Sequence, residues 1–293
     1  MQPTLMPKRY ARIEVEVGQK KDEKSKTITH DLQSFEGLNV RFNITKRRGS
    51  TMNRAEIAIC NLKTSTVEYL TTINALGGNQ KERKVLRLFA GYEGNAGQIF
   101  EGDIIRALPS APPDVWITAK CLSGYHNNMQ LVTLDLKGGV SPKQICDLVA
   151  KQLGLLLNWK CTSKKKLDQF KYQGPMTKAI EELNQIGDIV VYQDDRYLVV
   201  EDEKMTAPAA GEWIRTFSLE SGLIGLPEPD LCGVKFKVLL DPTLKCGQPI
   251  RLESQQIPSA NGVYYIYSLT HRGELRAEPF YTELSCRTYD AKN

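Results

Sequence analysis

The sequence predicts a mainly β protein with an α+β insertion, in which two small antiparallel β-barrel domains flank a small α+β module. Two observations support this fold class. Segments in the first and last thirds alternate apolar and polar residues with a period of two, so each strand has one apolar face. Glycine-rich turns separate these segments, as in antiparallel sandwiches and barrels. We expect three domains, at residues 1–125, 126–205 and 206–293.

The first β unit is predicted from about six short strands. Ile13, Val15 and Val17 alternate with charged residues in the first strand, and the charged stretch 18–34 is interpreted as a wide hairpin loop. A polar segment at 64–76 is compatible with a helix. The remaining strands are expected at 40–45, 55–62, 85–92, 98–105 and 115–122. This number of strands is enough to close a small barrel.

The middle third has helical periodicity. Ser141-Pro142-Lys143-Gln144 forms a capping box with proline at the first helical position, and Gly154 is a typical end for the helix that follows. Asp194-Asp195 is interpreted as the solvated turn of a hairpin. The other expected elements are a strand at 155–159, a helix at 177–186 and the hairpin strands 189–193 and 196–200.

The last third returns to a period of two after a linker at 206–211. A turn is predicted at His271-Arg272-Gly273-Glu274. The strands are expected at 234–240, 250–252, 263–269 and 280–288. These strands predict the second barrel-like unit.

The composition is that of an ordinary soluble globular protein, with 41% hydrophobic and 25% charged residues. No window approaches the roughly 18 consecutive apolar residues of a membrane helix. The N-terminus has no apolar stretch behind its basic residues, so we expect synthesis and assembly in the cytoplasm. Seven dispersed cysteines without a CxxC pair predict reduced, mostly buried thiols.

The net charge is mildly positive, at +5. Three basic runs are interpreted as solvated loops, although contact with nucleic acid or an acidic partner remains an open alternative. These runs are Lys20-Lys21 with Lys24 and Lys26, Lys46-Arg47-Arg48, and Lys164-Lys165-Lys166.

No catalytic constellation is recognisable. The three histidines are interpreted as surface or turn residues and three nearby tyrosines as strand-packing residues; they are His30, His126 and His271, with Tyr264, Tyr265 and Tyr267. The sequence therefore predicts no catalytic, cofactor-binding or metal-binding residue, no cofactor and no enzyme activity. We accordingly expect Asp194→Ala and His126→Ala to leave the fold intact.

Two motifs resemble those of phage baseplate hub proteins, which form the central hub of contractile tails and of related tail-like injection machines. The first is Arg54–Leu62 (RAEIAICNL), followed by Thr66 and Leu70. The second joins Leu88–Glu93 (LFAGYE) to Gly97–Ile104 (GQIFEGDI). Later segments that also look like this family are Gly222–Pro227 and Leu240–Gly247.

The resemblance implies a homotrimeric structural hub in the tail baseplate of the virion, assembled in the host bacterial cytoplasm. In that family the two barrels of each protomer stand side by side. Three protomers then present six barrels, which adapt a threefold central spike to the sixfold tail tube and form part of the DNA-ejection channel. The implied partners are the spike, the tail tube or tube-initiator proteins, the tape-measure protein and other baseplate proteins. DNA would contact the hub only in passage through the lumen, and no stable membrane insertion is implied.

Two alternatives come from other functional classes. A barrel-type nucleic-acid-binding protein would use basic loops and aromatic side chains, with an affinity that falls steeply with salt, whereas a hub is expected to show little free binding. A tail-associated cell-wall hydrolase would normally need an additional domain that carries a carboxylate pair or a metal set, and the chain has no spare domain for it.

Overall fold

The computed structural model describes residues 7–21, 28–49, 52–71, 84–128, 130–186, 188–209 and 211–289. For residues 17–21 and 28–31 it describes the backbone alone. The fold is mainly antiparallel β, as predicted. The first unit contains β1 (Arg9–Lys21), β2 (Ile28–Glu36), β3 (Val40–Arg47), β4 (Arg54–Cys60), α1 (Thr64–Leu70), β5 (Val85–Tyr92), β6 (Asn95–Pro109) and β7 (Trp116–Leu122).

The middle unit contains α2 (Tyr125–Asn128), β8 (Leu131–Val140), α3 (Pro142–Leu153), β9 (Leu156–Trp159), β10 (Leu167–Pro175), α4 (Met176–Gln185), β11 (Ile189–Asp194) and β12 (Tyr197–Asp202). The last unit contains β13 (Arg215–Phe217), β14 (Leu223–Asp230), β15 (Gly233–Leu239), β16 (Pro249–Leu252), the 3-10 helix η1 (Pro258–Ala260), β17 (Gly262–Glu274) and β18 (Phe280–Arg287).

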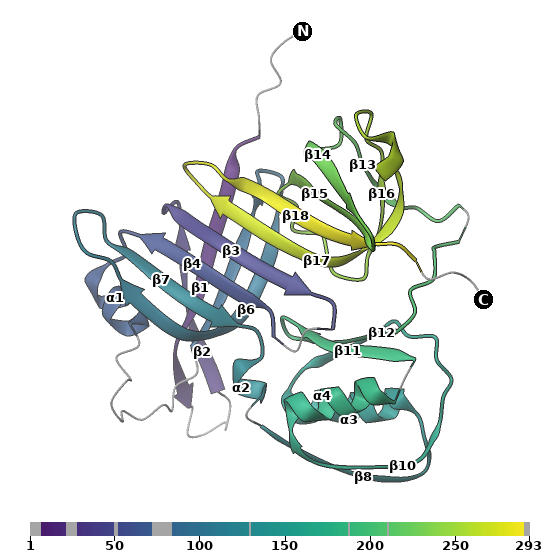
Figure 1. Cartoon of the computed structure of the whole chain (residues 1–293). Helices are drawn as coiled ribbons and strands as arrows, with labels where there is room; N and C mark the ends of the chain where they lie inside the picture. Colours follow the sequence, from purple (N-terminus) through teal and green to yellow (C-terminus); the bar gives the residue numbers. More distant parts are fainter. Residues whose placement is uncertain are drawn as a thin grey trace.

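One continuous sheet joins the first and last units. Its strands follow the order β14-β15-β18-β17-β3-β4-β7-β6-β5-β1-β2, with β16 paired to β17 and β13 paired to β16. The connection is an antiparallel pairing of β17 with β3, from Ser268 opposite Arg47 to Glu274 opposite Arg41. Figure 1 shows β15, β18, β17, β3, β4 and β7 lying side by side across the molecule.

The expectation of two closed barrels is not confirmed. Among the described strands the sheet is open, with β2 at one end and β14 at the other. The physical reason is that β17 occupies the edge of β3 that a closed first barrel would use for its own first strands. Pro227 and Pro229 lie in β14, where proline removes backbone donors and is tolerated because the strand is at an edge.

The predicted inward faces are confirmed in the first unit. Val40, Phe42 and Ile44 of β3 are buried and alternate with exposed residues. Ile57 and Ile59 of β4 are buried against the same core. This core also contains Leu240 and Phe280 of the last unit, so the packing as well as the sheet crosses between the two units. The last unit has a further core of its own, built mostly on β15, β17 and β18.

The middle unit folds around its own apolar core. The capping box of α3 is confirmed: Ser141 Oγ accepts from Gln144 N at 3.3 Å, and Gln144 Oε1 accepts from Ser141 N at 2.9 Å. Gly154 ends the helix in the left-handed region, with φ 64°. Strands β8 and β10 were not predicted; they pair with each other as a separate two-stranded sheet.

Three predicted segments, a loop, a helix and a turn, differ from the structure or lie partly outside the described residues. Most of the expected loop at 18–34 is strand, because β1 continues to Lys21 and β2 pairs with it from Ile28; residues 22–27 are not described. Helix α1 ends at Leu70, and residues 72–83 are not described. The turn expected at His271 is strand, because β17 continues to Glu274 with β18 on one side and β3 on the other.

Candidate functional site

The β11–β12 hairpin of the middle unit inserts its charged tip where the first and last units meet. We call this region the hairpin junction, and it comprises Lys46, Arg48, Asn53, Glu101, Asp194, Asp195, Arg196 and Glu201. The hairpin has a tight turn because Asp195 adopts a left-handed conformation, with φ 52°, which aspartate tolerates. These residues come from the first and middle units, and Gly247 of the last unit lies against Glu201, so all three units meet at the junction.

Lys46 lies at the centre of the junction and is only 7% exposed. Its Nζ donates to Asp194 Oδ1 and to Asp195 Oδ2, each at 2.9 Å. Burial alone would lower the pKa of Lys46, but the charges of the two carboxylates raise it above its ordinary value, so the ammonium stays charged. Asn53 Nδ2 donates to Asp194 at 3.0 Å, and Glu101 N donates to Asp195 at 3.0 Å.

The two aspartates are not solvated, which corrects the sequence interpretation. The exposed fractions of their side chains are 17% for Asp194 and 13% for Asp195. Burial raises the pKa of both, and Lys46 counteracts it: the result is a lowered pKa for Asp194 and a raised pKa for Asp195, which also feels the charge of Asp194. Asp194→Ala is consequently expected to disturb the junction. The error arose because a local pattern cannot reveal a cation that is distant in sequence.

The second half of the junction fixes the other end of β12. Arg48 Nε donates to Glu201 Oε2 at 3.0 Å, and both side chains are buried. Lys160 Nζ donates to the other oxygen of Glu201 at 3.1 Å. The basic run at Lys46 and Arg48 is therefore an internal ion-pair site and not the solvated loop that the sequence predicted. Its middle residue, Arg47, is exposed, as expected.

Two glycines allow the hairpin to approach both β units closely. Gly247 of the last unit has φ +79°, and a Cβ there would come within 2.4 Å of Glu201 Oε1. Gly124 of the first unit has φ +68°, and a Cβ there would come within 2.2 Å of Gln193 Oε1. The left-handed conformation favours glycine at both positions, and the ends of Glu201 and Gln193 would have to move to admit a Cβ.

A cavity of about 620 Å³ lies beside the junction. Glu101 accepts from Arg87 at 2.9 Å and from Arg196 at 3.0 Å on its two oxygens. Burial would raise the pKa of Glu101, but the hydrogen bonds from these arginines lower it. Glu101, Asp194 and Asp195, which line this cavity, are each paired with a cation. The geometry therefore favours a rigid joint over acid–base chemistry.

His271 lines this cavity and is 1% exposed, so the surface position predicted for it is wrong. Its Nδ1 lies 2.8 Å from Thr282 Oγ1. Burial and the nearby Lys46 charge lower the pKa of His271 to about 3. His126 is exposed, as predicted, and the side chain of His30 lies outside the described residues.

The other residues considered from the sequence have packing roles. Tyr264 and Tyr265 are buried, and Tyr267 is half-buried. All seven cysteines are free; Cys232 is exposed and the other six are buried. Within the described ranges, no group of three or more His, Cys, Asp or Glu residues could hold a metal ion.

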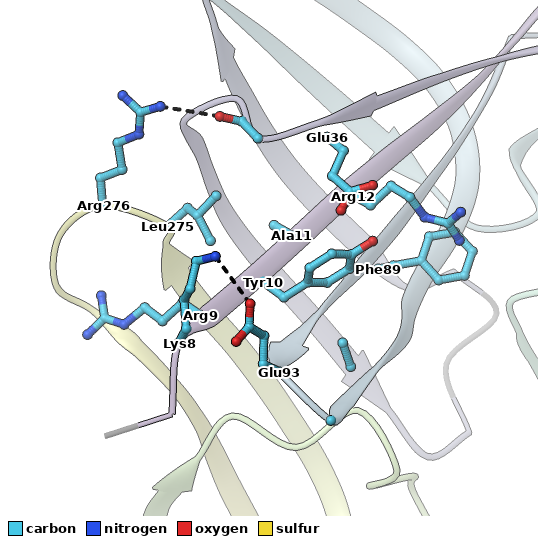
Figure 2. Close-up of a pocket in the computed structure, with 13 residues that line it drawn as sticks. Lys8, Arg9, Tyr10, Ala11, Arg12, Glu36, Phe89, Glu93, Leu275 and Arg276 are labelled. Carbon is cyan, nitrogen blue, oxygen red and sulfur yellow. Dashed lines mark hydrogen bonds and ion pairs between the residues drawn. The ribbon is translucent and has the colours of Figure 1, made fainter. Parts of the chain in front are cut away.

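A second hollow, of about 910 Å³, lies at the start of β1 (Figure 2). Pairing between β1 and β2 begins only at Arg12, so the edge of β1 before this residue faces the β17–β18 turn without an intervening strand. Arg9 donates to the carbonyl oxygen of Glu274 at 3.2 Å, and Arg276 donates to that of Gly37 at 3.2 Å. Hydrogen bonds from side chains therefore connect β1 and the residue after β2 to the β17–β18 turn, where a closed barrel would have backbone hydrogen bonds between paired strands.

Comparison with solved structures places the whole fold among tail proteins. The 43 kDa tail protein of prophage MuSo2 from Shewanella oneidensis matches with a TM-score of 0.60 and 10% identity, over 94% of this chain and 98% of that one. A tail protein from Neisseria meningitidis MC58 also matches with a TM-score of 0.60 and 10% identity, over 95% of this chain and 96% of that one. At these identities the likeness is one of fold.

A third similar structure is the E. coli c3393 protein, with a TM-score of 0.56 and 11% identity over 86% of this chain and 74% of that one. It is described as a component of the type VI secretion system with structural similarity to the phage T4 tail proteins gp27 and gp5. No curated protein sequence matches the chain.

The helices of the described chain are too short or too polar to cross a bilayer. The model of the baseplate hub gp41 family matches residues 12–286, which is nearly the entire sequence. This match extends across all three units and both sides of the hairpin junction. The chain therefore belongs to the baseplate hub gp41 family, and it is a structural protein of the phage tail baseplate.

Proposed function

We propose that this protein is the central hub of the baseplate: a homotrimer that adapts a threefold spike to the sixfold tail tube and encloses part of the DNA-ejection channel. The observation that carries the proposal is the pairing of β17 with β3. It fixes two β units side by side within one protomer, so three protomers would present six units. A ring of this kind can match a threefold partner on one face and a sixfold partner on the other.

In this proposal the chain has three domains, 1–125, 126–205 and 206–293, and each has its own structural role in the hub. The three apolar cores support the division, although Leu240 and Phe280 enter the first core. The hairpin junction would keep the middle unit at a fixed position against the two β units during assembly. Its buried ion pairs suit this purpose because they require one specific register of the partners.

Native mass spectrometry of the purified protein, alone and mixed with its spike protein, tests the proposal. A trimer is expected in at least one of the two samples, with three chains bound to one spike trimer in the mixture. A strict monomer under both conditions would refute it. Incubation of the same sample with purified peptidoglycan tests the hydrolase alternative, for which release of soluble muropeptides would be the positive result.

A further inference from the structure

The sheet that joins the two β units has a continuous outer face. Residues opposite each other in an antiparallel pairing lie on the same face of a sheet, so the register defines this surface across seven strands. One row across it consists of Leu239, Tyr281, Arg272, Asn43, Glu56, Lys120 and Arg106. Figure 1 shows β15, β18, β17, β3, β4 and β7 side by side, and β6 pairs with β7 at the end of the row.

Basic residues dominate this outer face. They are Lys235, Lys237, Arg287, Arg272, Arg41, Arg47, Arg54, Lys120 and Arg106, all exposed except the half-buried Arg287. The acidic residues on the same face are Glu56, Glu274, Glu283 and the buried Asp103. Nine basic and four acidic side chains give this one surface a net charge equal to the +5 of the whole chain, so the charges of the rest of the molecule nearly cancel.

Several of these cations lie against aromatic rings of the same face. Arg287 and Arg47 lie 3.5 Å and 5.0 Å from the ring centroid of Tyr267. Arg41 lies 4.1 Å from the ring of Trp116 and also contacts Glu274 at 2.8 Å. Cation–π contact holds the charged groups close to the sheet, so the surface is basic but low in relief.

The dimensions and chemistry of the face fit a duplex better than a protein partner. Seven strands at about 4.8 Å spacing span roughly 30 Å, and about 30 Å of duplex DNA carries roughly 18 phosphate charges. A stable protein interface normally has a central cluster of apolar or aromatic anchors. Here Tyr267 and Trp116 are already covered by guanidinium groups. Cations spread over several strands are typical of contact with a phosphate backbone.

We propose that this basic outer face is the surface along which double-stranded DNA passes, through weak contacts that do not depend on sequence. The proposal rests on the proposed function, because it assigns a face of the protomer to the channel of the hub. The contacts are electrostatic and are made by side chains restrained on the sheet. They balance the charge of the duplex without a tight grip that would hold it in place.

The test measures binding of the full chain to a fluorescently labelled random-sequence duplex by anisotropy, between about 50 and 200 mM salt. The face variant combines Arg54→Gln, Lys120→Gln and Arg272→Gln, three exposed residues for which no ion pair is found among the described residues. The matched control combines Lys164→Gln, Lys165→Gln and Lys166→Gln, which removes the same charge from exposed positions of the middle unit.

The wild-type protein is expected to bind weakly, and the face variant should lose at least about tenfold in affinity and lower the salt slope by about 2 to 3. The control should change affinity by less than about twofold. Equal losses in the two variants, or no loss in the face variant, would overturn the proposal.

Native mass spectrometry of the same samples separates this inference from the proposed hub. A face variant that loses assembly but retains DNA affinity would identify the surface as a protein interface and refute the DNA assignment. If the wild-type chain remained monomeric with its spike while the face variant still lost DNA affinity, the hub proposal would fail and the assignment of the DNA-contacting face would stand.

Discussion

Replacing Lys46 with methionine tests whether the hairpin junction holds the middle unit in place. The ammonium is almost fully buried and lies 2.9 Å from one oxygen of each aspartate. Methionine preserves most of the side-chain volume but leaves two buried carboxylates without their cation. Removing one partner of a buried ion pair costs about 3–5 kcal/mol. For a chain of 293 residues that unfolds as one unit, this corresponds to a fall in Tm of about 5–8 °C.

Differential scanning calorimetry measures this fall, and hydrogen exchange locates it. Exchange should accelerate in β11 and β12, while β3 and β4 should change less. The matched control is Arg47→Met, the adjacent residue on the opposite face of β3, which removes the same charge and only the contacts with Tyr267. That variant should lose less than about 1 kcal/mol.

A compensated variant makes the reasoning refutable. Lys46→Met combined with Asp194→Asn and Asp195→Asn removes the whole charged group, and most of the lost stability should return because no buried charge is left without a partner. If Lys46→Met were no more destabilising than Arg47→Met, or if the triple variant were less stable than Lys46→Met alone, the junction would not be a buried ion-pair lock.

Four further outcomes are expected. His271 stays neutral down to about pH 3 in the folded state and binds a proton below about pH 6.5 in the unfolded state. Stability should therefore fall as the pH decreases through this window, by at most about 1.4 kcal/mol per pH unit. Scans of Tm from about pH 7 to 5 should show a shallower slope for His271→Gln. His126→Ala should leave both Tm and this slope unchanged, because the residue is exposed. Ile57→Asp places a charge in the first core, which should lower the free energy of unfolding by several kcal/mol and give insoluble or unfolded protein. A soluble variant with wild-type circular dichroism and Tm would contradict the face assignment of β4. Alkylation monitored by mass spectrometry should label Cys232 in the native protein and all seven thiols after denaturation, with no dependence on reductant.

The periodicity of the sequence was sufficient for the elements whose determinants are local. The alternation at Val40, Phe42 and Ile44 identified the buried face of β3, because side chains of a strand point to opposite sides in turn. The capping box at Ser141 and the glycine at 154 defined α3, because a cap depends on residues three positions apart. The burial of most thiols followed from their positions within apolar patterns.

Strand pairing was decided by the tertiary structure. Nothing within β17 indicates that its second half pairs with β3, because any strand edge offers the same backbone donors and acceptors. That pairing turned the expected turn at His271 into buried strand and replaced two closed barrels by one open sheet. It also created the basic outer face, whose cations are unremarkable within each strand and become a surface only when the strands lie side by side.

The sequence by itself determined the fold class as mainly β and the inward-facing residues of the strands and helices whose periodicity it shows, such as β3 and α3. Only the tertiary structure decided which charged residues are buried. Lys46 and Asp194 form their ion pair across 148 residues of sequence, and each looks like an ordinary solvated residue in its own segment. A charge can be buried when an oppositely charged partner lies next to it in space, and the sequence does not show which distant residues become neighbours.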